Sequence, residues 1–434
     1  MLKGYYKWDT VLKDGNIIHN EGNIEEKVHL YIRDGKIEKI SKEYEEGAKE
    51  VTQCKDHYIT PSFVNLHSHV PMNILKGLAE DVNINDWFNV EIFPYESKLT
   101  PMDIYYGALL GISEMIDNGV TAFADHYFFA DKICDAVIKS GIRGDIAPTV
   151  FGLADNFEDI LNEASNLIEK RRNESSRLNL RMGPHAPYTC PPDKLKRIVE
   201  KAKELRVGLH IHVSETEEQV IQSLNEYGKT PFQMLNEADG FNLPLIIAHG
   251  LWVKEEDFKY INKNTFFAIC PKTYMKLGMG VGNVFNRYNE LPLCIGTDGG
   301  ASSNTLNPLE QLRLFALIGK LENRAEDFKL KDMWKILMRG HSALNFNTGE
   351  VKKGFNADLL IWDLSKSNTY PNYNPLASII YSGESKNIVH SMVDGKFIKK
   401  DGEVVFKNEL LWKEIETTSK NILNKGKGTN KVIY

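Results

Sequence analysis

The sequence predicts an α/β protein, a (β/α)8 TIM-like barrel with a small β-sandwich domain built from both ends of the chain. Three observations predict this fold. Residues 61–350 alternate short apolar runs with amphipathic stretches, as βα units do. Both ends of the chain instead carry alternating strands joined by Asp-Gly turns. Residues that can bind a metal or move a proton follow nearly every apolar run of the middle region.

The barrel is predicted from apolar runs that begin with "ITPSFVNLH" and end with "LPLCIGTDGG". Between them lie helix-like segments such as "PMDIYYGALLGISEMIDN" and "PPDKLKRIVEKAKELR". Eight βα units in roughly 290 residues match the size and rhythm of a (β/α)8 barrel. A doubly wound open sheet would also alternate, but no Gly-x-Gly-x-x-Gly opens a helix after a strand. The barrel is therefore favoured.

The terminal domain is predicted from "KVHLYIRDGKIEKIS", which alternates around an Asp-Gly hairpin. The same signature returns in "NADLLIWDL" and "HSMVDGKFIKKDGEVV". We therefore expect residues 1–60 and 351–410 to form the β-sandwich, residues 61–350 the catalytic barrel, and residues 411–434 a C-terminal helical extension.

Composition narrows the function classes. The 434 residues carry a net charge of −6 without long runs of one sign, which argues against a nucleic-acid or membrane-surface binder. No apolar stretch approaches the roughly 20 residues needed to cross a bilayer, and the N-terminus lacks a signal-peptide core. The five cysteines are scattered and never paired as Cys-x-x-Cys, which is typical of reduced cysteines. We expect a cytoplasmic protein with a small-molecule partner, and a homo-oligomer is compatible with the sequence.

Polar residues gather where the predicted strands end. The C-terminal strand ends of a (β/α)8 barrel converge on one mouth, where such enzymes place their chemistry. We therefore expect these residues to form one site. They are His67, His69, Asp125, His126, His185, His212, Glu215, His249 and Asp298.

Two His-x-His pairs stand out. Residues i and i+2 of a strand face the same side, so His67 and His69 can share one cation. Zinc prefers such nitrogen ligands. His210 and His212 repeat the spacing on the fifth strand. We expect His212, nearer the strand end, to be a ligand, and His210 to have a structural role or to orient a ligand from one layer deeper.

One metal fits better than two. A two-metal site needs a bridging anion from an acidic or modified lysine side chain on a middle strand, but the third run ends in "TVFG" and the fourth in "RMGPHAPY". Asp298 can ligate a metal and accept a proton from its water, although a turn or helix N-cap role is the alternative. We expect one divalent metal, zinc first, with iron and manganese as alternatives. Its ligands would be His67, His69, His212 and Asp298.

Glu215 follows His212 by three residues and can stand beside the metal without binding it. It would take a proton from the metal water and deliver it to a ring nitrogen of the substrate. Zinc deaminases of a different fold use a non-ligand Glu in this way. The alternative is that Glu215 merely caps the helix "ETEEQVIQSL". His249 is left to polarise the water or the reacting atom.

Six stretches together resemble the amidohydrolase superfamily. They are "PSFVNLHSHVPMNILKGLAEDVNINDWF", "GPHAPYTCPP", "HIHVSETEEQV", "YGKTPFQML", "AHGLWV" and "GTDGGASSNTLNPLEQLRL". Within it, the chain most resembles S-adenosylhomocysteine/5′-methylthioadenosine deaminases and the related triazine chlorohydrolases, over nearly its whole length. The resemblance implies zinc or iron on the four ligands above. It also implies substrate contacts from Trp87, from Glu96 to ribose hydroxyls, and from His185.

Two departures from the family pattern bear on the substrate. Members that accept S-adenosylhomocysteine bind its carboxylate with arginines after the third strand, but "GDIAPTVFGLADNFEDILNE" has no arginine and several acids. A nucleoside with a neutral tail, or a bare heterocycle, is therefore favoured. The seventh-strand motif is altered to Ile269-Cys270-Pro271-Lys272-Thr273-Tyr274, and His126 stands where an apolar residue is common.

The sequence thus predicts a metal-dependent aminohydrolase in which hydroxide on the metal attacks the amine-bearing carbon of a ring. An adenosine-type nucleoside is favoured: 5′-methylthioadenosine, adenosine or a 5′-modified adenosine. The alternatives are a hydrolase of guanine, pterin, cytosine or a triazine that releases ammonia, an amine or chloride, and a non-catalytic metal-binding barrel.

Overall fold

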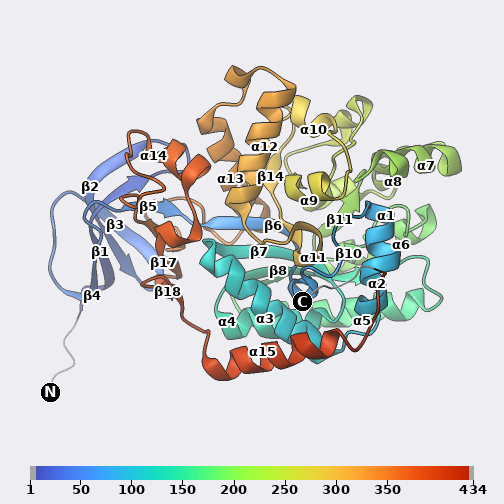
Figure 1. Cartoon of the computed structure of the whole chain (residues 1–434), viewed down its shortest axis with the longest axis horizontal. Coiled ribbons are helices and arrows are strands. Elements are labelled where there is room, and N and C mark those ends of the chain that lie inside the picture. Colours follow the sequence, from blue (N-terminus) through green and yellow to red (C-terminus); the bar gives the residue numbers. More distant parts are fainter. Residues whose placement is uncertain (1–5, 430–434) are drawn as a thin grey trace.

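The structure is a computed structural model that describes residues 6–429. Its centre is a barrel of parallel strands surrounded by helices (Figure 1). The barrel strands are β6 (Phe63–His69), β7 (Val120–Tyr127), β8 (Arg143–Val150), β9 (Leu178–Leu180), β10 (Gly183–Pro184), β11 (Leu209–Val213), β12 (Leu245–His249), β13 (Thr265–Ile269), β14 (Leu293–Ile295) and β15 (Asp298–Gly299).

Two sheets make up the barrel wall. One has the order β10-β8-β7-β6-β15 with β9 beside β8, and the other has the order β11-β12-β13-β14. A bridge between Met182 and Leu209 joins them on one side. On the other side the amide of Thr297, which follows β14, donates to the carbonyl of His67 in β6. If β9 and β10 are counted as one strand, and β14 and β15 as another, the barrel wall has eight strands. The predicted fold class is confirmed.

Helices follow the strands in the order expected of βα units. The longer ones are α3 (Pro101–Asp117), α4 (Ala130–Ser140), α5 (Phe157–Arg171), α6 (Pro192–Leu205), α7 (Glu217–Tyr227), α8 (Pro231–Glu237), α12 (Pro308–Glu322) and α13 (Leu330–Leu344). Short helices after the strands are η1 (Val70–Leu75), α1 (Ile84–Asp86), η2 (Trp87–Ile92), α2 (Phe93–Glu96), η3 (Gly240–Asn242), η4 (Glu255–Tyr260), α9 (Pro271–Lys276), α10 (Asn283–Asn286), α11 (Gly300–Ser303) and η5 (Ala325–Asp327).

A nine-stranded sheet forms the β-rich domain, in the order β19-β18-β17-β16-β5-β1-β2-β3 with β4 paired to β1. It combines both ends of the chain. The strands are β1 (Trp8–Ile18), β2 (Ile24–Arg33), β3 (Lys36–Ser41), β4 (Ala48–Gln53), β5 (Tyr58–Pro61), β16 (Leu359–Trp362), β17 (Ile388–Val393), β18 (Lys396–Lys400) and β19 (Glu403–Val404). The predicted Asp-Gly hairpin lies between β2 and β3, where Asp34 and Gly35 both have positive φ, as a tight hairpin turn requires.

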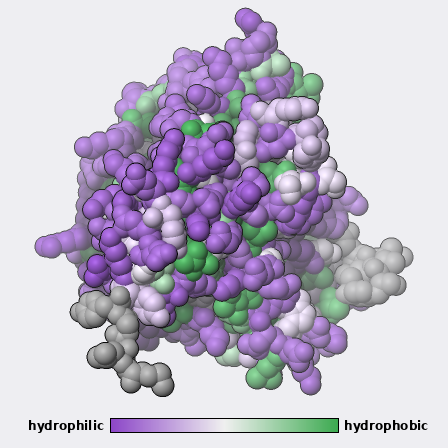
Figure 2. All heavy atoms as spheres, turned by 90° about the vertical axis from the view of Figure 1, so that its left-hand side faces the viewer, coloured by the Kyte–Doolittle hydropathy of each residue, from purple (hydrophilic) through white to green (hydrophobic). Residues whose placement is uncertain are grey.

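The sheet folds over its own apolar core. Strand β1 pairs with β4 through its first half and with β5 through its second, with register shifts near Gly15. A Cβ at Gly15 would lie 2.6 Å from a methyl of Ile59, so glycine lets the strand bend there. Ile59 packs in one cluster with Leu30 and Leu359, which joins the two ends of the chain. The outer face of this domain is mostly hydrophilic (Figure 2).

The C-terminal segment continues across the barrel. After α14 (Pro375–Ala377), η6 (Ser378–Ser382) and η7 (Ser385–Asn387), the chain completes the sheet and enters α15 (Glu409–Ile422), which lies along α3 (Figure 1). None of the helices among residues 6–429 is long and apolar enough to cross a membrane. The domain boundaries given above stay predictions, and their first and last five residues lie outside the described part.

A buried ion-pair network ties the domain to the barrel. The guanidinium of Arg143, at the start of β8, donates to both carboxylate oxygens of Asp358, at 2.8 and 2.9 Å. It also contacts Asp394, which pairs with Arg177 at 3.0 Å. Arg143 and Asp358 are each about 1% exposed. Because a buried charge without a partner is costly, these residues fix how the domain sits on the barrel.

We expect Arg143→Met to lower the free energy of unfolding by about 3–5 kcal/mol, because it leaves the buried Asp358 carboxylate unpaired. Urea unfolding followed by circular dichroism measures this. The matched control is Lys400→Met, which breaks an exposed pair with Glu50 within the same domain and should cost less than about 1 kcal/mol. Equal losses in the two variants would contradict the role of the network.

Candidate active site

The strand ends that face away from the β-rich domain hold the site (Figure 1). The backbone bends sharply at three of them, because Ser214, His249 and Asp298 have φ of 49°, 69° and 60°. Residues other than glycine rarely adopt such angles, and they persist where the surrounding structure imposes them. The bends turn the side chains at these positions into the barrel mouth.

Two imidazoles are fixed by backbone carbonyls. His69 Nδ1 donates to the carbonyl of His126 at 2.6 Å, and His212 Nδ1 donates to the carbonyl of His185 at 2.7 Å. Since a carbonyl only accepts, both Nδ1 atoms are donors, and the Nε2 atoms are left to face the cluster. These two Nε2 atoms lie 3.3 Å apart. In neutral rings their lone pairs would repel at this distance unless a cation lay between them.

The imidazole of His67 is held in place by that of His210. His67 Nδ1 lies 2.9 Å from His210 Nε2, so the two rings share one hydrogen bond. His67 Nε2 is buried and has no hydrogen-bond partner. It lies in a cluster with His69 and His212 whose ligand atoms are all within 4.8 Å of one another. His210 thus orients His67 from one layer deeper, as outer residues orient metal-binding histidines elsewhere.

Asp298 supplies the negative charge. Its Oδ1 lies 3.6 Å from His67 Nε2 and 3.3 Å from His69 Nε2. The hydroxyl of Ser302 donates to the other oxygen at 2.8 Å. Burial raises the pKa of Asp298, but the neighbouring imidazoles of His67, His69 and His249 outweigh it and hold that pKa well below its usual value. The donor set of three imidazoles and one carboxylate fits a divalent cation such as zinc.

Glu215 lies beside this cluster. Its Oε1 is 3.4 Å from His249 Nε2, and its Oε2 accepts from the side-chain amide of Gln219 at 3.5 Å. The N-cap of α7 is Thr216, whose hydroxyl accepts from the backbone amide of Gln219 at 3.2 Å. Glu215 is therefore not the capping residue of α7. Its carboxylate is free to face the cluster.

Burial sets the protonation states. Burial and the charges of neighbouring histidines together lower the pKa of His212 and of His249 to about 4, against the opposing charges of Glu215 on His212 and of Asp298 on His249. Both rings are thus neutral near pH 7, as metal binding and hydrogen bonding to water require. Burial raises the pKa of Glu215, while the charge of His212 lowers it by less. Glu215 thus holds a proton more tightly than an exposed glutamate does.

The residues assigned to substrate contact line the same mouth. Trp87 is buried, and its Nε1 donates to the carbonyl of Ala301 at 3.3 Å. The hydroxyl of Tyr127 donates to Glu96, whose pKa burial raises. The His185 ring lies 5.0 Å from that of His212. Aromatic faces and a carboxylate at one mouth suit a flat ring that carries hydroxyl groups.

The residues that depart from the family pattern, His126 and Tyr274, lie directly against the histidine cluster, as does Asp125. The ring of His126 is 5.0 Å from that of His212, and its Nε2 is buried without a hydrogen-bond partner. Asp125 accepts from the amide of Val70 at 2.6 Å, and burial raises its pKa to about 7. Tyr274, in the altered motif, packs its ring 5.7 Å from that of His249. These residues form the wall behind the candidate metal centre.

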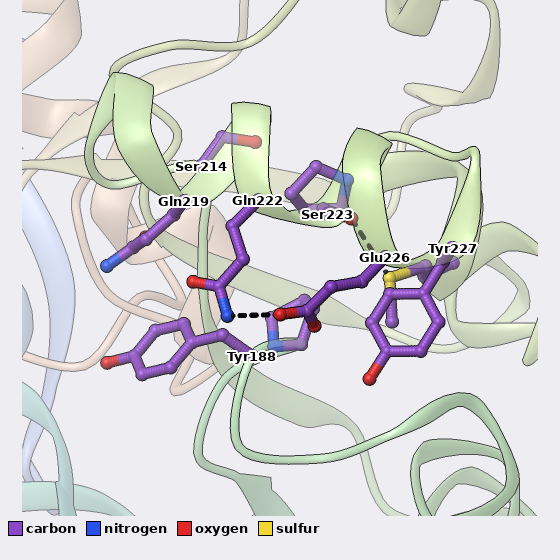
Figure 3. A pocket seen from close by; sticks show the side chains of 10 residues that line it. Tyr188, Ser214, Gln219, Gln222, Ser223, Glu226 and Tyr227 are labelled. Carbon is purple, nitrogen blue, oxygen red and sulfur yellow. Dashed lines mark hydrogen bonds between the residues drawn. The ribbon is translucent and has the colours of Figure 1, made fainter.

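A small side pocket adjoins Glu215. It lies between α7 and the segment that carries Tyr188, and Figure 3 shows Gln222 joined to Glu226 along the α7 side of it. Ser214 and Gln219 also line it, so the pocket is next to the carboxylate that they flank. Its lining combines polar side chains such as Gln219 and Gln222 with apolar ones such as Pro231 and Met234.

Sequence reasoning missed two supporting residues, Ser302 and Gln219. Ser302 is four residues after Asp298, and Gln219 is four residues after Glu215. Each donates to the carboxylate before it. Because residues four apart meet on a helix, a polar residue four positions after a candidate carboxylate was the available signal.

Comparisons with known proteins identify the family of the chain. Residues 58–398 match the model of the amidohydrolase family. The chain belongs to the amidohydrolase family. The resemblance predicted from the sequence is thereby confirmed.

Curated amidohydrolases resemble the chain over most of its length. It is 33% identical over 424 residues to a protein of Dictyoglomus turgidum named 5-methylthioadenosine/S-adenosylhomocysteine deaminase, covering 96% of this chain and 98% of the relative. It is 34% identical over 409 residues to a protein of the same name from Pyrococcus furiosus, covering 92% and 97% of the two chains.

Solved structures share the fold. An adenosine deaminase from Xanthomonas campestris with bound zinc superposes with a TM-score of 0.91 at 24% identity, covering 96% of this chain and 99% of the other. An atrazine chlorohydrolase from Arthrobacter aurescens TC1, complexed with zinc, gives a TM-score of 0.86 at 19% identity, covering 95% and 100%. At these identities the likeness establishes the barrel and its terminal domain.

We expect His126→Leu to become more stable relative to the unaltered protein as the pH falls. Burial lowers the pKa of His126 far below about 6.5, so below that pH the unfolded chain binds a proton that the folded one refuses. Stability from the neutral ring is therefore complete above about pH 6.5 and is lost on acidification. The difference in unfolding free energy should move by about 1.4 kcal/mol in favour of His126→Leu between pH 7.5 and pH 5.5. A pH-independent difference would contradict a neutral buried His126.

Proposed function

We propose that the protein is a metal-dependent deaminase that hydrolyses the ring amino group of an adenosine-type nucleoside. The observation that carries this is Glu215, a buried carboxylate 3.4 Å from His249 and beside, but outside, the ligand cluster. A non-catalytic metal site would have no use for such a pair. The names of the curated relatives support the substrate class.

The ligands are proposed to be His67, His69, His212 and Asp298. One divalent ion held there, zinc first and iron or manganese as alternatives, would lower the pKa of water toward neutrality. The convergence of lone pairs described above supports this assignment. His67, His212 and Asp298 are buried and His69 is partly buried, which limits the access of bulk water. In such a site electrostatic interactions are stronger than in solvent.

Glu215 and Asp298 move the two protons of the reaction. Glu215 takes one proton from the attacking water and passes it to the ring nitrogen next to the amine-bearing carbon. A raised pKa lets the carboxylate hold that proton until the ring accepts it. The carbon–oxygen bond forms and the carbon–nitrogen bond breaks. Asp298 passes the second proton to the departing amine, so that ammonia leaves.

His249 and the mouth residues position the reactants. The neutral imidazole of His249 would hydrogen-bond to the attacking oxygen from the side opposite the ring. Glu96 would accept from ribose hydroxyls, and Trp87 would cover one face of the nucleoside. His185, close to His212, would contact the purine edge. These roles stand on the geometry and on the family resemblance together.

A neutral 5′ substituent suits this chain better than an anionic one. The segment after β8, residues 151–163, contains four acidic residues and no arginine. A carboxylate there would meet repulsion rather than a partner. 5′-Methylthioadenosine and adenosine are therefore proposed ahead of S-adenosylhomocysteine. A panel with guanine, a pterin, cytosine and a chlorotriazine, followed by ammonia and chloride release, tests this order. Faster turnover of a chlorotriazine than of any nucleoside would overturn it.

We expect Glu215→Gln to lower kcat at least about 10²-fold, because the amide cannot carry the proton. Metal content, measured by elemental analysis, should stay at that of the unaltered protein. Glu218→Gln is the matched control, since Glu218 is an exposed acid in the first turn of α7, the helix that follows Glu215. Full activity in Glu215→Gln would exclude the proposed proton route.

Removal of the metal is expected to abolish deamination and to lower the thermal midpoint, since the converging imidazoles lose their common partner. Dialysis against a chelator, followed by return of zinc, iron or manganese one at a time, identifies the ion that restores activity. His69→Ala should bind less than one equivalent under the same conditions. A chelator-treated protein that keeps its activity and contains no metal would contradict the metal centre.

A further inference from the structure

A short helical segment at the barrel mouth carries two of the proposed substrate contacts. It consists of α1, η2 and α2, residues 84–96, with Trp87 at the start of η2 and Glu96 at the end of α2. Most of its side chains are at least partly exposed; those buried are Trp87, Glu91, Ile92 and Tyr95. Its own apolar contacts are therefore few, and its position depends on what covers it.

The chain after α15 covers this segment. The Nζ of Lys425 pairs with Asp103 at the first turn of α3, which anchors the start of the tail. The backbone amide of Thr429 donates to Glu91 Oε2 at 2.9 Å, and its hydroxyl donates to Glu91 Oε1. The amide of Gly428 approaches the hydroxyl of Tyr95 at 3.4 Å. The tail thus makes three polar contacts with the helical segment and one with the neighbouring α3.

The contact is too close for side chains larger than glycine. A Cβ at Gly426 would lie 2.5 Å from the carbonyl of Pro94, and a Cβ at Gly428 would lie 2.3 Å from Glu91 Oε2. The sequence "KGKGT" therefore places glycines where the tail touches the segment and leaves the side chain of Lys427 exposed. The tail therefore packs closely against the segment at Gly426 and Gly428.

Glu91 is the centre of the contact. It is 1% exposed, and a buried carboxylate is stable only where donors satisfy it. Thr429 supplies two donors, and hydrogen bonds to a charged acceptor are among the stronger ones. Glu91 lies four residues after Trp87 in the π-helical turn η2, so both side chains are carried by one short helical turn.

We infer that residues 425–429, through Glu91, are a positioning element for substrate binding. This rests on the proposed function, since Trp87 and Glu96 are there the contacts to the base and the ribose. With the tail in place the segment is preorganised, so the substrate loses less binding free energy in ordering it. The tail lies apart from Glu215 and the metal ligands. Its loss raises KM and leaves kcat nearly unchanged.

The test uses three variants of the full metal-loaded enzyme. Thr429→Val removes the hydroxyl donor, Gly428→Val introduces the clash with Glu91, and a chain that ends at Asn424 lacks the tail. KM and kcat are measured for 5′-methylthioadenosine by ammonia release. Amide hydrogen exchange of residues 84–96 is measured without substrate. We expect KM to rise about 10-fold with kcat within about 3-fold, and exchange to accelerate at 84–96 but not in the barrel strands.

Two control variants share the same tail. Thr429→Ser keeps the hydroxyl and should restore both KM and exchange, and Lys427→Ala should change neither. Unchanged exchange at 84–96 in all three variants would overturn the inference, as would equal acceleration throughout the barrel. If the unaltered protein deaminates no nucleoside, the proposed function fails. The exchange result then still decides whether the tail holds the segment.

Discussion

The protonated Nδ1 atoms of His69 and His212 each donate to a backbone carbonyl, and this forces their Nε2 lone pairs toward each other across 3.3 Å. Much of the remaining structure serves this arrangement. His210 turns His67 toward the same point, and Asp298 adds the negative charge that a cation there needs. The eight strands of the barrel bring these groups from distant parts of the sequence to one mouth.

The protein surrounds the cluster with groups whose charge states burial controls. Histidines that stay neutral can accept a cation, and a carboxylate with a raised pKa can carry a proton. The same environment would make an unpaired charge expensive, so the carboxylates have donors, as Glu215 has from Gln219. Function and stability thus depend on one property, the exclusion of water from the mouth.

Contacts between distant parts of the sequence hold the β-rich domain and the C-terminal tail against the barrel. Arg143 links the base of the barrel to the β-rich domain, and α15 delivers the tail to the segment that carries Trp87. Both are contacts between residues more than 200 positions apart in the sequence. The terminal segments contribute no proposed ligand, but they contact the barrel and the segment that carries Trp87.

The sequence by itself determined the fold class, because apolar periodicity is a local pattern. It also predicted which strand ends bear chemistry and different roles for His212 and His210, from the His-x-His spacing and from depth along a strand. The tertiary structure decided that Thr216 rather than Glu215 caps α7, that Ser302 and Gln219 support the carboxylates, and that residues 425–429 lie on Glu91. These contacts depend on rotamers and on long-range packing. No local pattern of residue types encodes them, because a hydrogen bond across the fold depends on where the backbone has carried both partners.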